Sequence, residues 1–88
     1  MVVGPMVGRA ILKGAVIRVG DHGANVARAD VRIEESRGEM EIAVYDTIST
    51  TTRVGSVELT LEDAEELLDA FGEGVRALRA AKPGSGRR

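Results

Sequence analysis

The chain has 88 residues, a formal charge of −2 at pH 7, one Tyr, one Phe and no cysteine. These properties exclude disulfide bonds and thiolate metal sites, and they argue against a domain that binds polyanions over its whole surface. A chain of this length forms one domain, close to the size at which a single hydrophobic core is only marginally stabilising, so we expect burial in a homodimer to supplement it.

The N-terminal twenty residues are mostly apolar, but Arg9, Lys13 and Arg18 interrupt them. No cleavage site follows an unbroken apolar run. We therefore expect neither a signal peptide nor a membrane span, and a cytoplasmic protein. Residues 1–6 are predicted to be an arm that is ordered only if it covers an edge or a partner. A single domain should occupy residues 7–82, and residues 83–88 a flexible basic tail.

Residues 7–19 favour a strand whose apolar positions change parity, and Gly14 in its middle indicates a β-bulge. Residues 20–23, Gly-Asp-His-Gly, predict a turn, because both glycines permit positive φ.

Alternation predicts two further strands, residues 25–35 and 39–48, each with one apolar and one charged face. Asp46 is the exception, since it falls on the apolar face. A four-residue loop, Glu35 to Gly38, would pair Arg32 with Glu41. A two-residue loop would set Glu34 opposite Glu41, and like charges opposed are unfavourable, so the longer loop is preferred.

The segment 49–53 contains no glycine or proline, and we place a chain reversal near residues 49–52. Val57 and Leu59 then alternate with polar residues as in a strand. Thr60 has the position of a helix N-cap, with Asp63 at capping-box spacing.

The helix that follows has acidic residues in its first turns and basic residues near its end, which complements the helix dipole. Gly72 and Gly74 weaken its middle, and we favour one helix that bends there. Its apolar positions form one stripe, which must be buried against the sheet or against a second copy of the helix. This helix stripe consists of Leu61, Ala64, Leu68, Phe71, Val75 and Leu78, broadened by Leu67.

The predicted fold is therefore α+β: a four-stranded antiparallel sheet in the order ββββα, with one C-terminal amphipathic helix packed on one face. The residues from Val57 to Leu67 resemble the endings of many short proteins of actinobacteria and their phages, which run strand, Leu-Thr-Pro-Glu-Glu-Ala, helix. This chain has Leu61 where proline is usual, and the resemblance implies a fold layout without an activity. Arginine outnumbers lysine ten to two, which also indicates a GC-rich genome.

Catalytic and metal-binding candidates are few. His22 beside Asp21 would need a nucleophile or a pocket, and a solvated turn explains it better. Asp46 is read as the end of a strand rather than a perturbed acid. The acidic residues Glu62, Glu65, Glu66, Asp69 and Glu73 are read as a solvated helix face. We expect no enzyme, no cofactor and no metal.

The charged face of the sheet offers an alternative function. Arg28, Arg32, Tyr45 and Arg53 should project there, and basic residues with an aromatic ring on an open sheet are typical of single-stranded nucleic-acid binding. The layout also resembles the single-stranded-DNA-binding transcriptional coactivator fold, which is dimeric. Interleaved carboxylates such as Asp30 and Glu41 allow a second interpretation, in which the face carries cross-strand ion pairs on a solvated sheet.

The leading hypothesis is a small non-enzymatic interaction module, a homodimer from a GC-rich bacterium or its phage. Either the sheet edges or the helices could form the contact between copies, with Leu61, Leu68, Phe71, Val75 and Leu78 as the packing stripe. The alternative is a single-stranded nucleic-acid binder that uses the outer face of the sheet.

Overall fold

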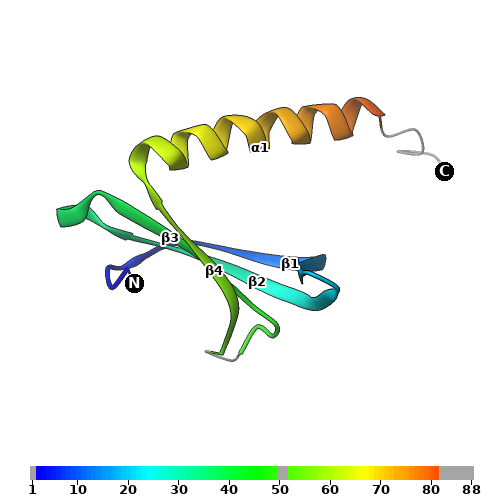
Figure 1. The fold of residues 1–88 in the computed structure, drawn as a ribbon, viewed down its shortest axis with the longest axis horizontal. Coiled ribbons are helices and arrows are strands. Elements are labelled where there is room, and N and C mark those ends of the chain that lie inside the picture. Colours follow the sequence, from blue (N-terminus) through cyan, green and yellow to red (C-terminus); the bar gives the residue numbers. More distant parts are fainter. Residues whose placement is uncertain (1, 50–51, 82–88) are drawn as a thin grey trace.

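The computed structural model describes residues 2–49 and 52–81, so the predicted tail at 83–88 lies outside the described residues. It contains one antiparallel sheet of four strands in the order β1-β2-β3-β4, followed by one helix (Figure 1). The predicted α+β fold is therefore confirmed. The elements are β1 (Met6–Val19), β2 (His22–Glu34), the short 3-10 helix η1 (Glu35–Arg37), β3 (Glu39–Tyr45), β4 (Arg53–Thr60) and α1 (Leu61–Ala81).

The pairing of β2 with β3 is the one predicted from the longer loop, because Arg32 lies opposite Glu41. The loop is η1 followed by Gly38, which has a φ of 63° and donates its backbone N–H to the carbonyl of Glu35 at 3.2 Å. A left-handed conformation of this kind costs glycine least. The same register sets Glu34 opposite Glu39, so the observed loop does not avoid a directly opposed pair of glutamates.

The bulge predicted at Gly14 is also present, as a register shift in β1 between Ile11 and Ala15. A second shift, between Met6 and Gly8, was not predicted. β3 ends at Tyr45 rather than at residue 48, and Asp46 is exposed directly after it. The reading of Asp46 as a strand end is therefore correct.

Residues 2–5 of the predicted N-terminal arm lie against the end of β2. The backbone N–H of Ile33 donates to the carbonyl of Pro5 at 3.1 Å, and Val2 is only 2 % exposed. Gly4 lies so close to this strand that a Cβ on it would be 1.6 Å from the carbonyl oxygen of Ile33. Only glycine fits at this position without moving backbone.

The two outer strands of the sheet approach each other. A Cβ at Gly55 on β4 would lie 2.7 Å from Cδ1 of Ile17 on β1, although two strands separate them in the sheet. β4 also crosses β2 and β3 at a steep angle (Figure 1). The sheet is thus coiled, as the right-handed twist of strands favours.

Coiling decides which face of the sheet is buried. The sequence predicted that the apolar face would be buried and the charged face exposed, and the structure differs. The centre of the face that carries the charges is buried, whereas the apolar face is only half-buried. The prediction that Arg28 and Tyr45 project into solvent is wrong, because a concave face encloses its own side chains. The buried residues are Val26, Arg28 and Asp30 of β2 and Glu41, Ala43 and Tyr45 of β3; the half-buried ones are Ala27, Ala29, Val31, Ile33, Met40, Ile42 and Val44.

α1 starts at the predicted cap, since the backbone N–H of Asp63 donates to Oγ1 of Thr60 at 3.2 Å. It continues through Gly72 and Gly74 as one helix. α1 runs above the sheet (Figure 1), and its main contacts are with β3 and β4. Among the described residues of α1 none is fully buried, so the sheet covers the helix stripe only in part.

Candidate interaction surface

An open apolar cleft lies between the first half of α1 and the apolar face of the sheet. It comprises two adjoining hollows of about 230 Å³ and about 170 Å³ that share Met40 of β3 and Ala64 of α1. We call this the helix–sheet cleft; its apolar lining is Ile33, Met40, Ile42, Leu61, Ala64, Leu67, Leu68 and Phe71.

The helix stripe remains largely in solvent beyond the cleft. Leu68, Phe71 and Leu78 are 71 %, 68 % and 72 % exposed. The exposed parts of the stripe amount to on the order of 500 Å² of apolar area, near the upper end of the largest patch on a typical monomer. Together with the cleft, the stripe forms one continuous apolar surface.

Charge is distributed unevenly along α1. Most of its acidic residues lie in the first half and are exposed, among them Glu62, Asp63 and Glu65, whereas Arg79 lies in its last turn. Arg76 pairs with Glu73 at 2.5 Å on the solvent side, and such an exposed pair contributes little stability. The helix therefore carries an apolar stripe between an acidic half and a basic end.

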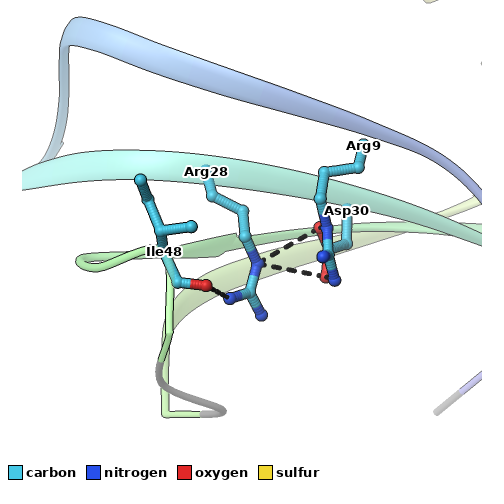
Figure 2. Close-up of polar contacts among 4 residues, drawn as sticks. All are labelled: Arg9, Arg28, Asp30 and Ile48. Carbon is cyan, nitrogen blue, oxygen red and sulfur yellow. Dashed lines mark hydrogen bonds and ion pairs between the residues drawn. The ribbon is translucent and has the colours of Figure 1, made fainter.

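The buried face of the sheet is organised around Asp30. Its carboxylate accepts two hydrogen bonds from Arg9, at 2.8 and 3.1 Å, and contacts Nε of Arg28 at 3.3 Å (Figure 2). Arg28 also donates to the carbonyl of Ile48, in the segment after β3. The hydrogen bonds from Arg9 lower the pKa of Asp30, and the charge of Arg28 lowers it further; the same contact raises the pKa of Arg9. The guanidiniums of Arg9 and Arg28 thus share the one carboxylate of Asp30.

A second pair completes this buried face. Arg53 of β4 donates to Oε2 of Glu41 at 2.6 Å, and the guanidinium of Arg28 lies 3.9 Å from the ring centroid of Tyr45. Glu41 is 1 % exposed, and its other oxygen, Oε1, has no hydrogen-bond partner among the described residues. A buried acceptor without a partner costs free energy, so this network is satisfied except at one atom.

The four residues predicted for a nucleic-acid face are therefore mostly engaged within the chain. Arg28 and Tyr45 are 5 % and 4 % exposed, and Arg53 is paired with Glu41. Arg32 is half-buried and donates to the carbonyl of Gly4 at 3.4 Å. The alternative interpretation, cross-strand ion pairs, describes Arg9 with Asp30 and Arg53 with Glu41, although the face that holds them is enclosed rather than solvated.

The candidates for chemistry are not brought together. His22 and Asp21 are exposed at the hairpin between β1 and β2, where Val19 pairs with His22. Asp46 directly follows Tyr45, which pairs with Arg28. Because Arg28 lies about 20 Å from His22 along β2, Asp46 is far from His22. Within residues 2–49 and 52–81, no group of three or more His, Cys, Asp or Glu side chains is arranged to hold a metal ion.

Comparison with protein-family models, with curated proteins and with solved structures finds no match for this chain. The two resemblances drawn from the sequence therefore stay predictions. In the part of the chain that the structure describes, no helix has the length and apolar character needed to cross a membrane.

Sequence reasoning did not foresee that Met40 and Ile42 would line an open cleft, because it expected the helix to cover them. Element lengths gave no warning in the sequence, because the predicted strand of residues 39–48 is about as long as the helix, whereas β3 ends earlier. A helix of 21 residues is about 31 Å long. β3, with 7 residues, spans only about 23 Å. The strands next to α1 are too short to cover its whole stripe.

Proposed function

We propose that this chain is a small non-enzymatic interaction module of the cytoplasm that acts as a homodimer. The observation that carries the proposal is the helix stripe, exposed along α1 and continuous with the helix–sheet cleft. The surface lies on regular elements and is apolar rather than charged, so it suits a protein partner better than a polyanion.

The energetics favour a dimer. Removing on the order of 500 Å² of apolar surface from each of two chains contributes roughly 10 kcal/mol per chain. Association costs about 4–15 kcal/mol in lost translational and rotational freedom. The apolar contribution is therefore of the same order as that cost, and a second copy carries the same surface.

The test is a pair of substitutions in the stripe, Leu68→Glu with Phe71→Glu, followed by sedimentation. The charges should turn a dimer into a monomer without loss of helix signal in circular dichroism, because both side chains are exposed in the free chain. Val19→Glu is the matched control, since Val19 is 73 % exposed at the end of edge strand β1. If Val19→Glu dissociates the dimer and the stripe variant does not, the contact is at the sheet edge and this proposal is wrong.

A further inference from the structure

We propose that the homodimer is built on α1, which pairs antiparallel with α1 of a second copy and crosses it near Gly72 and Gly74. This inference rests on the proposed homodimer and specifies its geometry. Three features support it: the spacing of the helix stripe, the charged residues that flank the stripe, and the two glycines that lie between those charged residues along the helix.

The stripe has the spacing of a coiled-coil seam. Leu61, Leu68 and Val75 recur every seven residues, and Ala64, Phe71 and Leu78 do the same. The alternation of steps of three and four residues makes these the a and d positions of heptads, which interdigitate between two helices. Leu68, Phe71 and Leu78 are also the most exposed large apolar side chains of α1.

The residues that flank this seam differ in charge from one end to the other. In the same heptad numbering the e positions are Glu65, Gly72 and Arg79. Antiparallel helices place e positions next to each other, so Glu65 of each copy meets Arg79 of the other, twice by symmetry. A parallel pair places e beside g, and the g positions Leu67, Gly74 and Ala81 carry no charge, so it forms no such pair.

The ion pairs fix the register of the antiparallel arrangement. With Glu65 opposite Arg79 of the second copy, Leu68 faces its Leu78 and Phe71 faces its Val75. Gly72 and Gly74 then lie nearest the two-fold axis. A Cβ at Gly74 would meet nothing within 4 Å in the single chain, so its surroundings are open for a second backbone. Leu61 and Ala64 line the helix–sheet cleft of their own chain, whereas Leu68 and Phe71 lie both on that cleft and on the seam.

Disulfide trapping tests this geometry directly, because the chain contains no native cysteine. Glu65→Cys and Arg79→Cys variants should form a mixed disulfide dimer when they are combined, and little when each is oxidised alone. Leu61→Cys should stay uncrosslinked, since residue 61 of one copy lies about 36 Å from residue 61 of the other in this antiparallel register. A parallel pair brings them together, so efficient crosslinking of Leu61→Cys would overturn the proposal.

A charge exchange gives a second readout. Glu65→Arg should raise the dissociation constant of the dimer roughly tenfold, because it replaces two attractive contacts by two repulsive ones. Adding Arg79→Glu to the same chain should restore the original constant. If the wild-type chain is dimeric but the double variant does not recover the original dissociation constant and no mixed disulfide forms, the homodimer stands and this geometry is wrong. If the wild-type chain is a monomer, the proposed homodimer itself is wrong.

Discussion

The guanidinium of Arg28 lies 3.9 Å from the ring centroid of Tyr45, and both side chains are enclosed by the coiled sheet. This cation–π contact belongs to a polar network that fills the concave face, whereas the apolar residues lie on the open side, under and along α1. The apolar face is therefore a better candidate for a binding surface than the charged face.

The first prediction concerns nucleic acid. Because Tyr45 is 4 % exposed and its arginine neighbours are paired, the ring offers no stacking surface to a base. We expect no change in anisotropy when a labelled single-stranded oligonucleotide is titrated to tens of micromolar protein at low salt. Tight binding that weakens steeply with salt and is lost on Arg28→Glu with Arg32→Glu would show that this face opens to a ligand.

The second prediction concerns the centre of the network. Asp30→Asn removes the carboxylate shared by Arg9 and Arg28 and leaves the buried guanidinium without a counter-charge. We expect a loss of about 3 kcal/mol in the free energy of unfolding by urea, at one protein concentration. Asp46→Asn, at an exposed position, should change it by less than about 0.5 kcal/mol and is the control. Equal effects of the two substitutions would mean that the network does not stabilise the fold.

The third prediction is the pH dependence that follows from the same residue. The pKa of Asp30 is lower in the folded chain than in the unfolded chain, because Arg9 and Arg28 stabilise the charged form. Its contribution to stability is therefore complete above the ordinary pKa of an aspartate, about 4, and is lost as the pH falls through the lower folded value. Between pH 6 and pH 2 the wild-type chain should lose more stability than Asp30→Asn, as measured by urea unfolding. Parallel profiles of the two chains would contradict this assignment.

Much of the fold was accessible from local patterns in the sequence. The longer loop preferred between β2 and β3 is the one observed, and Thr60 marked the start of α1. These features depend on neighbours within a few residues, or on one strand pair. Alternation shows which residues share a face, so Arg28, Asp30 and Arg32 were correctly grouped.

The choice of the buried face was not accessible in this way. It depends on coiling, which brings Ile17 of β1 against Gly55 of β4, and on the docking of Gly4 against Ile33, all of them contacts between segments distant in sequence. Alternation shows which residues share a face of a sheet, but it does not show toward which face the sheet curves. The apolar cleft was missed because the helix was expected to pack on the apolar face, with a strand that continued to residue 48.

The fourth prediction tests the docked N-terminal segment. Gly4→Ala places a methyl group 1.6 Å from the carbonyl oxygen of Ile33, where only backbone movement can make room. We expect loss of the hydrogen bond from Ile33 to Pro5, seen as faster amide exchange at Ile33, and a destabilisation of about 1–3 kcal/mol. Gly8→Ala is the matched control, because the nearest atom to its new Cβ is Cβ of Val31 at 3.9 Å. An unchanged exchange rate at Ile33 in Gly4→Ala would show that the segment is not held there.

The central claim is that the exposed helix stripe is covered by a second copy of the chain. Sedimentation equilibrium of the unmodified 88-residue protein, over a concentration series from one to one hundred micromolar, tests it most directly. We predict a mass of twice 9.3 kDa at the upper concentrations, with dissociation only toward the lower end. A mass of 9.3 kDa throughout the series would contradict the account.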